Sequence, residues 1–138
     1  ILLTNKGIPQ FIVLAKQKSI TGGIIDWKAI ELYSPNFSRD KPIVLPAKYQ
    51  KDLEKVLGGD FEINKFIDLG SIYLDEKVFL NQNNLFAATI ETAGQINEGK
   101  NLKQLEIVPI CEKDKLIKKT KSGIILNILA KMEVFGIL

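Results

Sequence analysis

The chain contains no histidine, one cysteine (Cys111) and one arginine (Arg39) among its 138 residues. Without histidine, the Ser-His-Asp and Cys-His mechanisms are excluded, as are His-ligated zinc and the non-haem iron triad. One thiol cannot form an intrachain disulfide or build a cysteine-based zinc or iron–sulfur site. Cysteine content therefore gives no sign of an oxidising compartment, and we predict a cytoplasmic (intracellular) protein without cofactor or metal.

Long hydrophobic runs are also missing, since no stretch reaches the roughly 18–20 apolar residues that a membrane helix needs. Hydrophobic residues make up 46% of the chain, charged residues 25%, and the net charge is +3. These values are typical of one folded domain rather than a disordered chain. We therefore predict a single domain over residues 1–138 with no membrane span.

Most of the chain has the pattern of short β-strands. Strands are predicted around the turn at residues 5–7, and at 24–33, 61–69, 72–80, 85–96 and 102–110. The predicted helix covers residues 46–57, because Pro46 suits a first helical turn and the Gly58-Gly59 pair ends it. We predict a β-rich α+β fold with this one helix. Its sheet is either small and twisted or a partly closed barrel, for which an oligonucleotide-binding-like barrel is an option.

The C-terminal region divides into a polar and an apolar part. Residues 111–122 are polar and are predicted to form a loop, whereas residues 123–138 are apolar. We predict a strand in the second half of that apolar stretch, and helix is the alternative for residues 124–131. If residues 102–110 and the stretch after Gly123 pair as a hairpin, the polar segment is the loop between them.

The net charge of this polar segment equals that of the whole protein. Five lysines against two acids give residues 112–121 a charge of +3, which equals the net charge of the chain. Clustered lysines contact phosphates as point charges, without selecting bases; a solvated surface loop is the alternative interpretation. The predicted nucleic-acid-binding lysines are Lys113, Lys115, Lys118, Lys119 and Lys121.

Single-strand binding also requires flat side chains on which bases can stack. The segment 33–39 combines Tyr33 and Phe37 with Arg39, so these three residues join the predicted binding site. Trp27, Tyr73 and Phe86 are further candidates, although aromatic residues more often belong to the core. Arginine is the side chain preferred for contacts to guanine in the major groove. The 18 lysines against one arginine therefore argue for contacts to the nucleic-acid backbone rather than to bases.

Three functions follow, in this order of preference. The first is a non-enzymatic binding protein for single-stranded nucleic acid, such as single-stranded DNA, through the basic loop. The second is a protein–protein interaction or assembly module, in which the apolar terminal strands at residues 1–4 and 134–138 pair with another subunit or form a homo-oligomer. The third is a metal-dependent nuclease-like enzyme, suggested by Asp26-Trp27-Lys28, although residues 1–25 supply no second carboxylate.

Overall fold

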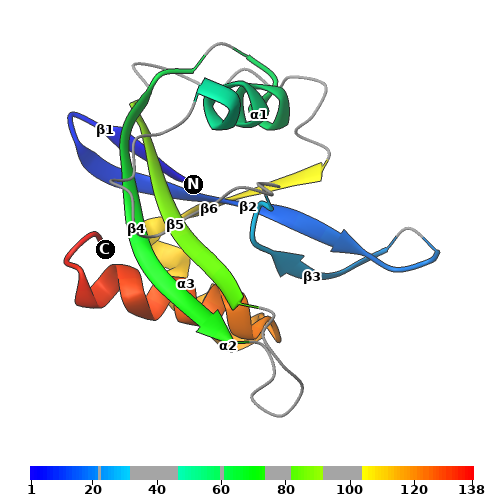
Figure 1. Ribbon diagram of the computed structural model, residues 1–138. Coiled ribbons are helices and arrows are strands. Elements are labelled where there is room, and N and C mark those ends of the chain that lie inside the picture. The colour runs from blue at the N-terminus through cyan, green and yellow to red at the C-terminus, as the bar shows by residue number, and fades with distance from the viewer. Residues whose placement is uncertain (22, 32–46, 60, 74–81, 92–103) are drawn as a thin grey trace.

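The structure is a computed structural model in which residues 1–21, 23–31, 47–59, 61–73, 82–91 and 104–138 are described. Its elements form a mixed sheet with α1 on one face and α2 and α3 on the other (Figure 1). In chain order they are β1 (Leu2–Asn5), β2 (Ile8–Lys18), β3 (Ile24–Lys28), α1 (Ala47–Leu57), β4 (Ile63–Tyr73), β5 (Gln82–Glu91), β6 (Leu105–Pro109), the 3₁₀ turn η2 (Ile110–Glu112), α2 (Lys113–Lys119) and α3 (Gly123–Val134).

The long strand β2 organises the sheet. Its first half pairs with β1 and its second half with β3, both antiparallel. Phe11 and Ile12 pair with both β1 and β6, so β6 must occupy the opposite edge of β2. On the other side, β1 pairs in parallel with β5, and β5 pairs antiparallel with β4. Within the described residues the order β3-β2-β1-β5-β4 leaves the sheet open. The predicted strand-rich α+β fold is therefore confirmed, as a twisted sheet rather than a closed barrel.

Both faces of the sheet are apolar because alternate side chains point to opposite sides. Leu2 and Ile12 face α2 and α3, where they pack with Leu116, Ile125 and Leu129. On the opposite face, Leu3, Val13 and Ile90 pack with Leu57 of α1. A sheet covered on both faces reads as apolar runs without clean alternation, which explains the weak strand periodicity of this sequence.

Helix α1 confirms the predicted helix at residues 46–57. Leu53 and Leu57, one helical turn apart, are buried, whereas Lys51 and Lys55 are exposed. The helix ends where Gly58 adopts a left-handed conformation (φ +76°) and donates its N–H to the carbonyl oxygen of Glu54, at 2.8 Å. Glycine adopts this conformation without a steric penalty, so the end of α1 is a local property of the sequence.

The C-terminal region differs from the prediction. The polar segment is helical in α2, and the apolar stretch forms helix α3 rather than a terminal strand. The helix alternative for residues 124–131 is confirmed, and the strand at residues 134–138 is wrong. Ile125, Leu129 and Met132 recur at helical spacing and are buried, but the exposed Leu126 and Val134 hide this period. The expected hairpin is also wrong, because β6 pairs with β2.

The expected pairing of terminal strands with another subunit is wrong as well. Strand β1 is hydrogen-bonded on both edges, to β2 and to β5, so neither edge is open for a further strand. At the other end, the residues after Val134 follow a helix. Among the described residues, no helix has the length and apolar character to span a membrane.

Candidate functional site

Helix α2 presents the predicted lysines, but they are not equivalent. Lys113 donates to the carboxylate of Glu133, and this hydrogen bond and charge raise the pKa of Lys113. Lys115 is paired with Glu112 at 3.1 Å. Lys118, Lys119 and Lys121 are exposed, and no carboxylate in the described part of the chain forms an ion pair with them. The available positive charge therefore lies at the end of α2 and at the corner that follows it.

Two buried residues attach α2 to the body of the protein. Leu116 is only 2% exposed and belongs to the core between the sheet and α3. Thr120, at the end of the helix, is also buried. Ile117, next to Leu116, is 38% exposed and points away from this core. The seven-residue helix is too short to be stable alone, so these contacts determine where its lysines lie.

Asp26 of β3 holds the corner between α2 and α3. Its carboxylate accepts hydrogen bonds from the Thr120 hydroxyl (3.1 Å) and from the backbone N–H of Lys121 (3.0 Å). Thr120 in turn accepts from the N–H of Ser122, whose hydroxyl caps α3 by accepting from the N–H of Ile125. These contacts join residues 94 and 95 positions apart. They fix Lys121 beside the edge strand β3.

The same contacts change the ionisation of Asp26. Partial desolvation would raise the pKa of its carboxyl group, but hydrogen bonds from the N–H groups of Trp27 and Lys121 and from the Thr120 hydroxyl outweigh it. Together with the charge of Lys121, they lower the pKa below its ordinary value. A lowered pKa in the folded state stabilises the protein above the unfolded pKa, and this stabilisation disappears as the pH falls through the folded pKa.

We therefore expect Asp26→Asn to lower the free energy of unfolding at neutral pH by roughly 1 kcal/mol, as for the loss of a side-chain cap. Asparagine has one acceptor oxygen where aspartate has two, so it cannot accept from both the Thr120 hydroxyl and the Lys121 N–H. The difference from the wild type should shrink as the pH falls below about 4, because Asp26 then becomes protonated in both states. Urea titrations at several pH values measure this, with Asp52→Asn on α1 as the control. A pH-independent difference would contradict the role given to the charge of Asp26.

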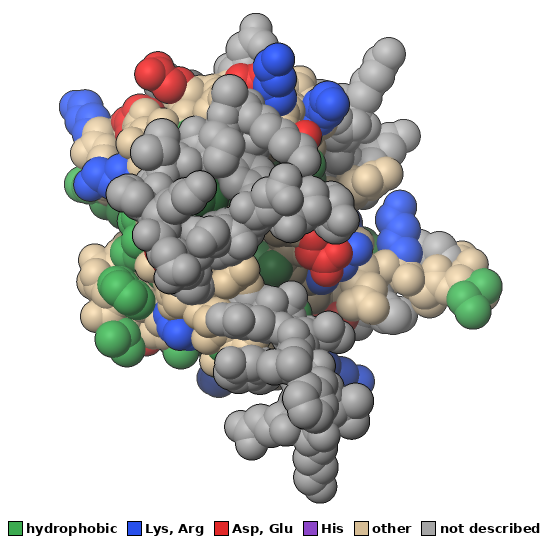
Figure 2. All heavy atoms as spheres, viewed as in Figure 1, with side chains coloured by type: hydrophobic (Ala, Val, Ile, Leu, Met, Phe, Trp, Pro, Cys, Tyr) green, Lys and Arg blue, Asp and Glu red, His purple; other side chains and the backbone are tan. Residues whose placement is uncertain are grey.

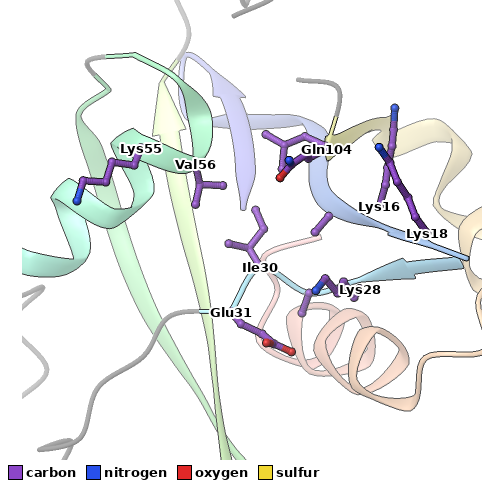
Figure 3. Close-up of a pocket in the computed structure, with 11 residues that line it drawn as sticks. Lys16, Lys18, Lys28, Ile30, Glu31, Lys55, Val56 and Gln104 are labelled. Carbon is purple, nitrogen blue, oxygen red and sulfur yellow. The ribbon is translucent and has the colours of Figure 1, made fainter. Parts of the chain in front are cut away.

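A cleft of about 600 Å³ lies at the base of the β2–β3 hairpin, beside the C-terminal part of α1 (Figure 3). Apolar side chains and lysines line this cleft in similar numbers. Ile30 and Val56 lie toward each other across it, whereas the amine of Lys55 points away (Figure 3). The residues around it are Ala15, Lys16, Lys18, Lys28, Ala29, Ile30, Glu31, Lys55, Val56, Gln104 and Leu105.

The cleft combines an apolar floor with a rim of lysines and the carboxylate of Glu31. Ala15, Ile30, Val56 and Leu105 supply apolar surface, and Lys16, Lys18 and Lys28 supply positive charge. Lys16 lies 3.6 Å from the carboxylate of Glu106. Lys18 and Lys28 are exposed, and neither forms an ion pair with a carboxylate of the residues that the structure describes. Such a cleft suits a ligand with a flat apolar part and a negatively charged part.

The cleft and the α2–α3 corner adjoin along β3. Asp26 holds the corner with Lys121, and Lys28 lines the cleft. Asp26 and Lys28 are separated by about 7 Å along β3, since each strand residue advances the chain by 3.2–3.4 Å. We group the exposed lysines of the corner and of the rim under one name, the basic surface: Lys18, Lys28, Lys118, Lys119 and Lys121.

Sequence reasoning found only the α2 part of this surface. Lys28 lies in the strand predicted at residues 24–33 and Lys18 lies outside the predicted strands, and nothing nearby in the sequence shows that they border a cleft. The alternation of Lys16 and Lys18 against Ala15 and Gln17 was the available signal, because it marks a basic face on a strand. The predicted residues Tyr33, Phe37 and Arg39 lie outside the described residues.

Two of the other aromatic candidates, Trp27 and Phe86, pack against other residues of the fold. Trp27 packs against the core on the α3 side of the sheet. Phe86 stacks on Phe66 of the neighbouring strand, with ring centroids 4.8 Å apart and an angle of 19° between the planes. The backbone of Tyr73 belongs to β4. Neither Trp27 nor Phe86 is among the residues that line the cleft.

The nuclease alternative gains no support from the described residues. The carboxylate of Asp26, which began that argument, holds the Thr120 hydroxyl and the Lys121 N–H. In the described ranges, no group of three or more His, Cys, Asp or Glu side chains lies close enough to hold a metal ion. Cys111, the one cysteine of the chain, is exposed on η2.

Comparison with known proteins found no match among protein-family models, curated proteins or solved structures. The geometry and the charge of the chain itself are therefore the basis for a functional hypothesis. The basic surface and the cleft beside it are the two features on which such an argument can be built.

Proposed function

We propose that this protein binds single-stranded nucleic acid without base specificity, through phosphate contacts made by the basic surface. The observation that carries the proposal is the junction at β3, where Asp26 fixes Lys121 beside the cleft that Lys28 borders. On both sides of this junction lie exposed lysines that form no ion pair within the described residues, and they offer a path for a negatively charged strand. Because nucleic acid occurs inside cells, the proposal also implies an intracellular protein.

The chemistry of lysine accounts for the lack of base specificity. Lysine neutralises phosphates as a point charge and releases their counterions, whereas arginine forms the bidentate contacts that read guanine. The basic surface contains lysine alone, and the one arginine of the chain, Arg39, lies outside the described residues. Contacts of this kind fix the path of a backbone but carry no sequence information.

The cleft favours a single strand over a duplex. Its volume of about 600 Å³ is in the range of small-molecule sites, and its floor is formed by Ile30, Val56 and Leu105. An unpaired base can turn its apolar face toward such a floor, whereas the bases of a duplex are stacked and paired inside the helix. Phosphates on either side of the base would then lie near Lys18 and Lys28.

The test is the salt dependence of binding. We expect fluorescein-labelled oligothymidine to bind with an affinity that falls about 100-fold between 50 and 200 mM salt. This follows from a slope of about −0.7 per phosphate contact for a single strand, or about −3.5 for five contacts. Fluorescence anisotropy measures the slope, and oligoadenosine and a mixed sequence should give similar values. Absence of binding at low salt, or a slope near zero, would contradict the proposal.

A further inference from the structure

The hairpin formed by β2 and β3 projects from the body of the protein (Figure 1), and Figure 2 shows a hydrophobic side chain at the end of this projection. The residue at the tip is Ile20, which is fully exposed, with a relative accessible surface of 107%. The tip is closed by a hydrogen bond from the N–H of Ser19 to the carbonyl of Gly23, at 2.7 Å. Ile20 therefore stands on a short, closed turn rather than against the core.

One exposed isoleucine is ordinary on a protein surface, but this one belongs to a basic projection. Ile24, which is 55% exposed, lies opposite Lys18 in the strand pair. Lys16 and Lys18 alternate along β2 and lie side by side in Figure 3. No acidic residue occurs between Lys16 and Ile24. The hairpin thus presents an apolar tip with positive charge behind it.

We propose that Ile20 is a wedge that inserts between adjacent bases of the bound strand, while Lys18 contacts a neighbouring phosphate. This inference rests on the proposed function and adds a second contact region to it. Apolar side chains that protrude from a protein surface can enter a base step and interrupt its stacking. Bases of a single strand are open to such a contact because no pairing has to be broken. The positive charge behind the tip draws the phosphates toward the hairpin.

The wedge contact and the phosphate contacts have different signatures. Loss of an apolar contact to the bases weakens binding equally at every salt concentration, because no counterion is involved. Loss of a phosphate contact changes the slope of affinity against salt. Ile20→Ser is therefore the decisive variant, and Ile8→Ser is its matched control. Ile8 is another exposed isoleucine, at 62%, and lies at the β1–β2 turn.

We expect Ile20→Ser to lower the affinity for oligothymidine about tenfold, with an unchanged salt slope and an unchanged thermal unfolding midpoint. Ile8→Ser should bind like the wild type. A second probe is an oligoadenosine that contains 2-aminopurine, whose fluorescence rises when its neighbours unstack. Wild-type protein should raise this fluorescence, and Ile20→Ser should raise it less.

Two other outcomes separate the two proposals. If Ile20→Ser binds like the wild type while the steep salt slope persists, the wedge is wrong and the proposed function stands. If the wild type shows no salt-dependent binding, both proposals are wrong.

A lipid surface is the competing partner for the hairpin, and phosphatidylserine vesicles test it in a separate co-sedimentation assay. Co-sedimentation with vesicles that needs Ile20, without binding to either oligonucleotide, would overturn the wedge and assign the hairpin to a lipid surface.

Discussion

Replacing Lys118 and Lys119 together by glutamate is expected to lower the affinity for a single-stranded oligonucleotide about 100-fold at low salt. The reason is that each change removes a phosphate contact and adds a like charge, and a loss of about 1.4 kcal/mol at each position is a tenfold loss in affinity. These two lysines are chosen because they are exposed and unpaired among the described residues, whereas Lys113 and Lys115 are paired with Glu133 and Glu112.

The slope of affinity against salt should fall by about 1.4 in the same variant, because two contacts of about 0.7 each are lost. The matched control is the double replacement of Lys51 on α1 and Lys65 on β4 by glutamate. Both are exposed, neither lines the cleft, and the net charge changes by the same amount. Equal losses in the two variants would show that binding responds to net charge alone, and the basic surface would then have no special role.

Replacing Leu116 by alanine is expected to lower the free energy of unfolding by about 3 kcal/mol. Truncation of a fully buried leucine removes its transfer free energy and leaves a cavity. Leu116 is 2% exposed and packs in the core between the sheet and α3, where it is the buried residue of α2. The variant should also weaken oligonucleotide binding, because α2 would no longer hold Lys118 and Lys119 in place.

The neighbouring residue provides the control for this experiment. Ile117 has a similar size but is 38% exposed, so Ile117→Ala should cost less than about 1 kcal/mol. Urea denaturation followed by circular dichroism measures both variants. A loss for Ile117→Ala as large as that for Leu116→Ala would mean that α2 packs through a different face, and the assignment of its lysines to the solvent would be wrong.

Elements whose limits are set by neighbouring residues could be predicted from the sequence. Helix α1 lies where predicted, because its end depends on Gly58 and its buried face on Leu53 and Leu57. The strands of the β1–β2 pair follow from the turn between them, where Gly7 has a positive φ. In each case the controlling interaction is local, and the prediction needs no knowledge of the rest of the chain.

Helix α3 and the site could not be predicted in this way. The apolar stretch that forms α3 is rich in isoleucine and leucine, which suit a strand as well as a helix, and only its packing on the sheet through Leu129 decides between them. The cleft is formed by β2, β3, α1 and the residues around Leu105, which the fold brings together from four regions. No pattern of neighbouring residues in the sequence indicates that these four regions lie together.

The sequence by itself determined which chemistries are absent and where the net charge lies. The lack of histidine and the single cysteine exclude the Ser-His-Asp and Cys-His mechanisms and the metal sites built from these residues. Residues 112–121 have a net charge equal to that of the whole chain. Tertiary structure decided which of those lysines are available. Lys113 is paired with Glu133, which lies 20 positions later in the chain. The backbone N–H of Lys121 is hydrogen-bonded to Asp26, which lies 95 positions earlier. Charge content is a sum over residues, whereas the free charge at a surface depends on distances that only the folded chain defines.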